Sequence, residues 1–203
     1  MDRNRMMRKP PRVEESSLKH VSFLGRGSFG CVSLQRDSNF RLYAKKSSSS
    51  FNQVKDFNKE VRIMLRFRNH PRIVQALSSF VHLSAPPDAE GCHIYMEYAS
   101  KGTLFNMISR FRGRPMPENM IGRAAFMILQ GLEILHSNGY VHCDLKPANV
   151  LVFPSTTVGE PWCWIWVSPS FNRLSYRPTI ETVTPKTQEG RPTKAHLSGR
   201  LSS

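Results

Sequence analysis

The sequence predicts an α+β fold in which an antiparallel sheet with one helix is followed by a helical region. Short runs typical of strands lie between residues 18 and 46, and again between residues 73 and 99. After residue 102 the apolar residues recur at helical spacing instead. Strands followed by helices indicate two lobes, which we expect to join near residues 98–102.

Five strands are expected in the first lobe. The run LKHVSFLGRG enters a glycine-rich loop and FGCVSLQR leaves it, and the turn residues DSN then lead into a third strand, FRLYAKK. The serine run Ser47–Ser50 is expected to end that strand. IVQALSSFVHL and CHIYMEYA predict two more strands, separated by the loop SAPPDAEG.

Three helices are expected. The spacing of apolar residues in VKDFNKEVRIMLRF predicts the first, which Asn69-His70-Pro71 ends. TLFNMISRF predicts a short second helix. The third and longest begins near Pro117 and ends at Asn138-Gly139. Its expected apolar face contains Ile121, Ala125, Ile128, Leu132 and Leu135.

The net charge of the chain is compatible with an anionic partner but does not identify one. The 203 residues carry a formal net charge of +14, which is compatible with an anionic partner. The basic residues are scattered, however, and no motif of aromatic and basic residues supports RNA binding. The densest basic group, MDRNRMMRKPPR, predicts a flexible arm over residues 1–17, with docking to an anionic surface as the alternative. No stretch approaches the roughly 18 apolar residues of a membrane span, so we expect neither nucleic acid nor a membrane as partner.

The cysteines and the C-terminal segment indicate the cellular location and the extent of the folded part. Four cysteines lie far apart without a C-x-x-C pair, which argues against a zinc site and against a dense disulfide framework. Reduced thiols and the lack of a visible secretory signal predict the cytoplasm, with the nucleus as an alternative. From Cys163 onward the chain is rich in Ser, Thr, Pro and Arg, so residues 163–203 are expected to form a disordered tail.

A glycine-rich loop is the first candidate binding element. Gly25, Gly27, Gly30 and Val32 form the pattern G-x-G-x-x-G-x-V. Glycines let backbone N–H groups approach phosphates closely. A dinucleotide-binding turn shares this pattern but requires a helix directly after the loop. Here a strand follows, so a glycine-rich hairpin fits better.

The third strand and the first helix supply a second group of candidates. Alternation places Ala44 and Lys46 on one face of the strand, where the small Ala44 leaves room for a planar base and Lys46 reaches phosphate oxygens. Glu60, in the following helix, is positioned to pair with Lys46. Taken alone, each of these charged residues also fits an ordinary exposed surface position.

The segment from His142 to Asn149 carries the most specific spacing. Asp144 is suited to accept a hydroxyl proton or orient a nucleophile, and Lys146 to neutralise a transferring phosphoryl group. Asn149 offers a carbonyl oxygen to Mg²⁺. The alternative is a polar turn rich in helix-capping residues.

Together and in this order, the glycine loop, the A-x-K strand, the helix glutamate and H-x-D-L-K-P-x-N resemble the eukaryotic protein kinase signature. Asp-x-Lys-Pro is similar to the serine/threonine branch. GRGSFGCVSL, YMEYASKGTL and GLEILHSNGYVHCDLKPANVLV resemble plant mitogen-activated protein kinase kinase kinases of the MEKK-like group. The resemblance covers residues 18–162. It implies a kinase-like N-lobe of five strands and one helix (18–97), a hinge (98–102) and an incomplete helical C-lobe (103–162).

The resemblance also implies roles for individual residues and partners. ATP and Mg²⁺ would be the cofactors, and Ser/Thr of a downstream protein kinase the substrate. Asp144 would be the catalytic base, Lys146 a phosphate contact and Asn149 a Mg²⁺ ligand. The implied ATP contacts are the phosphate-covering Gly25, Gly27 and Gly30, the adenine-flanking Val32 and Ala44, the phosphate-binding Lys46 with its partner Glu60, the gatekeeper Met96, and the hinge from Glu97 to Ala99.

Two departures from the family pattern shape the functional expectation. Cys143 replaces the usual arginine before the catalytic aspartate, which puts control by a phosphorylated activation loop in doubt. No Asp-Phe-Gly follows Asn149 and no Ala-Pro-Glu occurs, so the second Mg²⁺ ligand is missing. We therefore expect a kinase domain truncated near Trp162, which has lost useful phosphoryl transfer. The alternative is a nucleotide- or partner-binding fragment, and exposure of the long helix predicts binding to chaperones.

Overall fold

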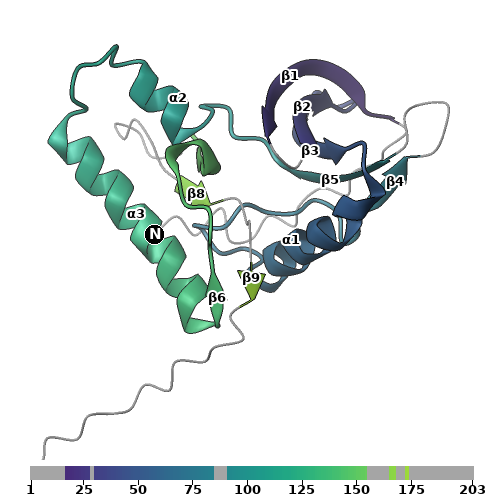
Figure 1. The fold of residues 1–203 in the computed structure, drawn as a ribbon. Coiled ribbons are helices and arrows are strands. Elements are labelled where there is room, and N and C mark those ends of the chain that lie inside the picture. Colours follow the sequence, from purple (N-terminus) through teal and green to yellow (C-terminus); the bar gives the residue numbers. More distant parts are fainter. Residues whose placement is uncertain (1–16, 28–29, 85–90, 155–164, 168–171, 174–203) are drawn as a thin grey trace, which may run out of the picture.

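The computed structural model describes residues 17–27, 30–84, 91–154, 165–167 and 172–173 (Figure 1). Predictions for residues 1–16 and 174–203 lie outside the described residues. Within the described part, no helix is long and apolar enough to cross a bilayer.

The first lobe is built on a single five-stranded sheet. Its spatial order is β1-β2-β3-β5-β4, and each neighbouring pair is antiparallel. The α+β prediction of a five-stranded antiparallel sheet with one helix is therefore confirmed. Figure 1 shows that the first three strands curl strongly above β5. The strand bounds are β1 Lys19–Gly27, β2 Gly30–Arg36, β3 Leu42–Ser48, β4 His82–Ser84 and β5 Gly91–Glu97.

Two strands differ from their expected lengths. β3 continues to Ser48, into the serine run that was expected to end it. The stretch predicted as a strand over residues 73–83 contributes only the start of β4 and an isolated bridge between Ala76 and Met96. Between these points the Ser78 hydroxyl donates to the carbonyl of Phe80 at 3.0 Å. Such local side-chain bonds compete with a continuous ladder, which explains the interruption.

The helix α1, Val54–Arg66, packs beneath the sheet, and a short 3₁₀ turn, η2 (Phe51–Gln53), precedes it. The chain leaves α1 through Asn69, whose φ of 66° reverses its direction before the expected Asn-His-Pro breaker is complete. The apolar side of α1 fills the main core together with β5. The side chains of this core that are at most 2% exposed are Phe57, Val61, Met64, Val74, Ala76, Cys92, Ile94 and Leu135.

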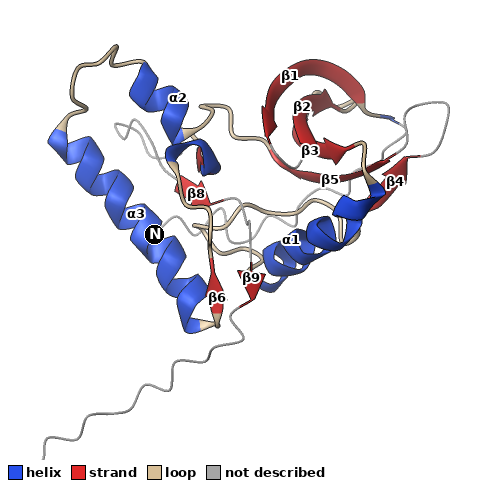
Figure 2. Cartoon of the chain, in the orientation of Figure 1, coloured by secondary structure: helices blue, strands red, loops and turns tan. Residues whose placement is uncertain are grey.

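The described part of the second lobe combines helices with short strands (Figure 2). The helices are α2, Leu104–Ser109, and α3, Glu118–Ser137. A second apolar cluster joins both helices to β7. The remaining described elements are β6 Tyr140–Val141, the 3₁₀ turn η3 Pro147–Asn149, β7 Val150–Val152, β8 Ile165–Val167 and β9 Asn172–Arg173.

The buried face of α3 is rotated from the expected one. Ile121 is 48% exposed, and Ala125 is exposed as well. Apolar residues occur on more than one side of this helix, so helical spacing alone did not select the packed side. The contact with the loop after α1 selects it, because Gly131 lies against Arg72 there. The buried positions are Ala124, Met127, Gly131 and Leu135.

Two short strands lie within the segment predicted to be a disordered tail. β8 pairs antiparallel with β7, and β9 pairs antiparallel with β6. An open strand edge offers unpaired backbone groups, which recruit a following segment without any sequence periodicity. These five residues of the predicted tail therefore lie in strands, and the rest of that segment lies outside the described residues.

Two leucines of α3 test its packing directly. Leu135 is 0% exposed and Leu129 is 62% exposed. We expect Leu135→Ala to lower the free energy of unfolding by about 2–5 kcal/mol, because it empties a filled core position. The matched control Leu129→Ala should change it by less than about 0.5 kcal/mol. Urea denaturation measures both, and equal effects would contradict the orientation of the helix.

Candidate active site

The glycine-rich turn joins β1 to β2, and Gly27 pairs with Gly30 across it. Gly30 is required by the fold, because its φ is 128° and an added Cβ would lie 2.0 Å from the carbonyl oxygen of Ser47. Gly25 and Gly27 are different, since a Cβ at either position would meet nothing within 4 Å. Their backbone therefore faces open space, which is the arrangement that a ligand approaching the main chain requires.

The residues expected to flank an adenine ring lie together. The strand register places Val32 opposite Lys46 and Ala44 opposite Met96. Ala44 and Met96 are buried in the main core, and the half-buried Val32 packs against it. The sequence-predicted set Val32, Ala44 and Met96 is thus brought to one region of the sheet.

Lys46 and Glu60 form the expected ion pair between β3 and α1. Lys46 Nζ lies 2.5 Å from Glu60 Oε1, and both side chains are nearly buried. The ammonium group also lies 5.3 Å from the centre of the Phe57 ring. Burial raises the pKa of Glu60 above its ordinary value, although the nearby Lys46 charge acts in the opposite direction.

The segment from Glu97 to Gly102 connects the sheet to the second lobe. Glu97 Oε1 accepts a hydrogen bond from the Gln75 amide at 3.0 Å, and the Glu97 amide donates to the Gln75 carbonyl at 3.1 Å. The Ala99 carbonyl accepts from the Gly102 amide at 3.0 Å. Ala99 is only 7% exposed, yet its own amide N–H makes no hydrogen bond among the described residues. Such an amide is available to an acceptor on a bound ligand.

The same segment is tied to the strand that follows the catalytic-loop candidates. The Lys101 amide donates to the Val152 carbonyl at 3.2 Å, and the Val152 amide donates to the Gly102 carbonyl at 2.8 Å. Because β7 continues directly from η3, these bonds fix the turn containing Asn149 relative to the hinge.

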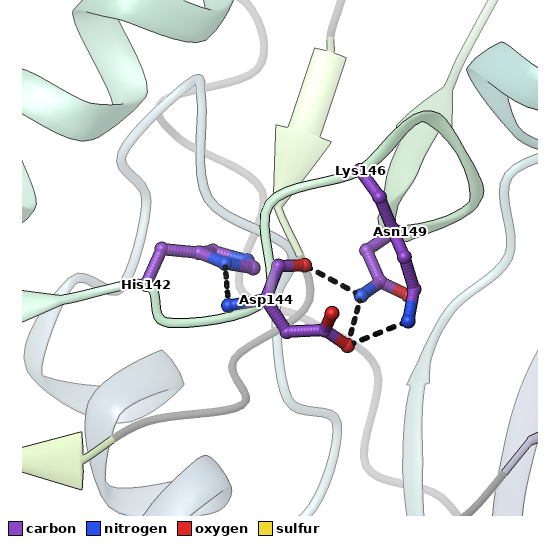
Figure 3. Close-up of polar contacts among 4 residues, drawn as sticks. All are labelled: His142, Asp144, Lys146 and Asn149. Carbon is purple, nitrogen blue, oxygen red and sulfur yellow. Dashed lines mark hydrogen bonds and ion pairs between the residues drawn. The ribbon is translucent and has the colours of Figure 1, made fainter.

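The loop from His142 to Asn149 gathers its polar side chains around one carboxylate (Figure 3). Asp144 Oδ2 accepts from Asn149 Nδ2 at 2.8 Å and lies 2.9 Å from Lys146 Nζ. Asn149 Nδ2 also donates to the Asp144 carbonyl at 2.8 Å. His142 Nδ1 accepts from the Asp144 amide at 3.2 Å, and His142 itself is buried. The loop therefore holds Asp144 from both its side chain and its backbone.

Electrostatics keep Asp144 ionised. The hydrogen bond from Lys146 is the main cause that lowers the pKa of Asp144 below its usual range, with a further contribution from Asn149. Cys143, which stands before it, has a φ of 45° and an exposed side chain. An ionised carboxylate on an ordered loop is suited to accept a hydrogen bond from a hydroxyl group.

The donor set for a divalent cation is incomplete. Asn149 presents its amide nitrogen to Asp144, which leaves its Oδ1 as a neutral oxygen ligand. The Asp144 carboxylate is already paired with Lys146. Within the described ranges, no group of three or more His, Cys, Asp or Glu side chains lies together. The residues present therefore do not fit a tightly held Mg²⁺, and no step is assigned to one.

The predicted site residues fall into two groups that the structure joins through the hinge. Sequence reasoning missed Gln75, which anchors Glu97, and the support that His142, the first residue of the H-x-D motif, gives to the Asp144 backbone. Neither could be found from spacing, because both act through contacts that only the fold creates. The sheet-side group is Gly25, Gly27, Gly30, Val32, Ala44, Lys46, Glu60, Met96, Glu97 and Ala99, and the loop group is Asp144, Lys146 and Asn149.

Comparison with known proteins assigns the family. The protein kinase domain profile matches residues 18–158, so the chain belongs to the protein kinase family. Rho-associated protein kinase 1 of Homo sapiens is 32% identical over 146 residues, which are 70% of this chain and 10% of that protein. The serine/threonine-protein kinase SSK22 of Saccharomyces cerevisiae is 33% identical over 150 residues, covering 68% of this chain and 11% of that protein.

A plant relative is also similar. Mitogen-activated protein kinase kinase kinase 20 of Arabidopsis thaliana is 28% identical over 141 residues, covering 66% of this chain and 40% of that protein. The chain thus spans less than half the length of these relatives. The family explains why the glycine turn, the Lys46–Glu60 pair and the Asp144 loop occur in one chain, since these are the nucleotide-binding and catalytic-loop elements of protein kinases.

The raised pKa of Glu60 predicts two opposite pH effects. On acidification Glu60 takes up a proton at a higher pH than an ordinary carboxyl, so the ion pair with Lys46 weakens early and nucleotide affinity falls. Because the folded-state pKa lies above the unfolded value, the contribution of Glu60 to stability increases over the same interval.

Glu60→Gln is the matched control. Titrating ADP with the wild type and with this variant between pH 7 and pH 5 cancels the protonation of the nucleotide itself. The wild type should lose affinity faster than the variant, while its stability relative to the variant should rise. A constant affinity ratio across this range would contradict the assignment.

Proposed function

We propose that this chain binds ATP at the site between the glycine turn and the hinge, and that it transfers phosphate from ATP only slowly. The observation that carries the proposal is the nearly buried Lys46–Glu60 pair, whose lysine lies opposite Val32 in the strand that leaves the open glycine turn. The buried Ala99 amide supports it, since a ring nitrogen of adenine is an acceptor of suitable chemistry.

Each group of residues has a defined task in this proposal. Lys46 binds phosphate oxygens, and Glu60 holds its ammonium group in position. Asp144 orients the hydroxyl group of a Ser or Thr and accepts its hydrogen bond. Lys146, 2.9 Å from that carboxylate, is placed to neutralise charge on the transferred phosphoryl group.

Slow transfer follows from the residues around the metal position. Protein kinases hold Mg²⁺ with the aspartate of an Asp-Phe-Gly segment and with the catalytic-loop asparagine. In this chain Ser168, Pro169, Ser170 and Phe171 follow β8, and no Asp-Phe-Gly occurs anywhere after Asn149. One well-placed electrostatic group contributes about 10²–10³ to the rate, so the loss of this aspartate is expected to be severe.

The finer family placement is also part of the proposal. The similarity to mitogen-activated protein kinase kinase kinase 20 of Arabidopsis thaliana supports a mitogen-activated protein kinase kinase kinase type, whose substrate would be Ser/Thr of a downstream protein kinase. The described cysteines, Cys31, Cys92 and Cys143, are free thiols. That state supports a cytoplasmic location, with the nucleus as the alternative.

A second candidate function is non-catalytic binding of nucleotide or protein, in competition with a catalytically complete kinase. The exposed apolar residues of α3 favour it, because Phe126 is 60% exposed and Leu129 is 62% exposed. Exposed apolar surfaces of this kind attract protein partners, chaperones among them. Capture of a purified chaperone by the wild type but not by Phe126→Ser/Leu129→Ser would support this candidate.

Nucleotide affinity should depend on Lys46 and little on Mg²⁺. We expect Lys46→Met to weaken ATP binding about tenfold or more, since it removes a charge-assisted contact to phosphate. Lys45→Met, at the neighbouring residue, is the matched control and should leave affinity within about twofold. Adding Mg²⁺ should strengthen wild-type binding by less than about threefold, because only a neutral ligand remains. Calorimetric titration that shows strong Mg²⁺ enhancement would contradict the incomplete donor set.

Phosphoryl transfer should be close to absent. The measurement is the incorporation of labelled γ-phosphate into the chain itself and into a generic protein substrate. We expect a wild-type rate within about threefold of Asp144→Asn, because loss of the metal ligand already limits the reaction. A wild-type rate well above that of Asp144→Asn would show that another residue completes the metal site.

A further inference from the structure

We propose that the loop joining α2 to α3 is a docking site for an acidic segment of a protein partner. Three arginines, Arg110, Arg112 and Arg114, alternate along this loop and are all exposed. None of them forms an ion pair or a side-chain hydrogen bond with a described residue. The proposal rests on the proposed function only in taking the partner to be a protein.

The charge around this loop is one-sided. No Asp or Glu occurs between Glu97 and Glu118, whereas that interval contains Lys101 and the three arginines. Glu118, at the start of α3, pairs with none of them. Unpaired guanidinium groups attract anions, and their planar forks match carboxylates in bidentate geometry.

The loop is ordered enough to present these side chains in fixed directions. The amides of Arg110, Phe111 and Arg112 donate to the carbonyls three residues before them, at 3.0–3.2 Å. The Arg114 amide donates to the Phe111 carbonyl at 2.9 Å. Phe111 is half-buried between exposed arginines. The arginines therefore stand on a hydrogen-bonded turn, so a partner has less disorder to remove when it binds.

Exposed apolar side chains of α2 lie beside the arginines and favour a partner that also has apolar groups. Phe105 is 57% exposed and Ile108 is 43% exposed, and their three-residue spacing places them on one side of α2. An acidic peptide that also contains apolar side chains matches both features. A single-stranded nucleic acid would need several aromatic platforms, but this surface offers one exposed ring and an aliphatic neighbour.

The position of the loop suits a partner of the candidate active site. α2 packs against η3 and β7, which are continuous with the Asp144 loop. Figure 1 shows the α2–α3 loop at the upper left, on the far side of the second lobe from α1. A segment bound there would lie on the same lobe as Asp144 without covering the nucleotide-binding strands.

The test is fluorescence anisotropy with a labelled peptide of glutamates containing two leucines, titrated with the full chain without nucleotide. We expect Arg110→Gln/Arg112→Gln/Arg114→Gln to weaken binding about tenfold or more. The matched control, Lys55→Gln/Arg62→Gln/Arg68→Gln, removes the same charge from exposed positions near α1 and should change affinity less than about twofold. Thermal unfolding verifies that both variants fold. Equal losses in the two variants would overturn the proposal.

Further variants and probes separate the effects of guanidinium geometry, apolar contact and general attraction to anions. Replacing the three arginines with lysine keeps the charge and should give intermediate affinity, whereas unchanged affinity would overturn the bidentate arrangement. Phe105→Ser/Ile108→Ser should weaken the leucine-containing peptide but not its serine analogue. Polyuridylate and phosphatidylserine vesicles serve as competing anions. A larger effect of the arginine substitutions on either of them than on the peptide would overturn the choice of a protein partner. Because ATP is absent, failure of nucleotide binding leaves this result interpretable.

Discussion

The ion pair between Lys46 and Glu60 is the interaction on which the candidate site depends. It joins β3 to α1 across the core at 2.5 Å, with both charged groups nearly buried. Burying two charges is costly unless they remain paired, so each residue constrains the position of the other. β3 can keep the Lys46 ammonium group buried only while α1 stays docked with Glu60 facing inward. The same contact therefore serves the fold and, in the function proposed here, the binding of phosphate.

The hinge connects the sheet that contains Lys46 to the second lobe. Hydrogen bonds between residues 101–102 and Val152 connect the end of the sheet to β7, and β7 follows the turn containing Asn149. Asp144 then receives Lys146 and Asn149 from its own loop. The hinge bonds thus fix the position of the Asp144 loop relative to the sheet that contains Lys46. What its sequence lacks is an Asp-Phe-Gly segment after Asn149, whose aspartate holds Mg²⁺ in protein kinases.

Much of the candidate site could be predicted from the sequence, because its residues occur in short motifs with characteristic spacing. The glycine hairpin, the pairing of Lys46 with Glu60 and the spacing from Asp144 to Asn149 follow from strand alternation and short loops. The parts that were not predicted depend on contacts that hydrophobic spacing does not reveal, whether local or distant. β4 is shortened by a local hydroxyl bond, Gly131 against Arg72 sets the rotation of α3, and β8 forms because β7 has an open edge. The charge of the α2–α3 loop was not predicted either, since spacing does not reveal that its arginines pair with no residue in the described part of the chain.

The most direct test is a double-mutant cycle on nucleotide binding with Lys46→Met, Glu60→Gln and the double variant. If Glu60 acts by positioning Lys46, its removal should weaken ADP binding only while Lys46 is present. We predict a coupling free energy of about 1 kcal/mol or more between the two residues. Additive effects of the two substitutions, with a coupling energy near zero, would contradict the claim that this ion pair organises the site.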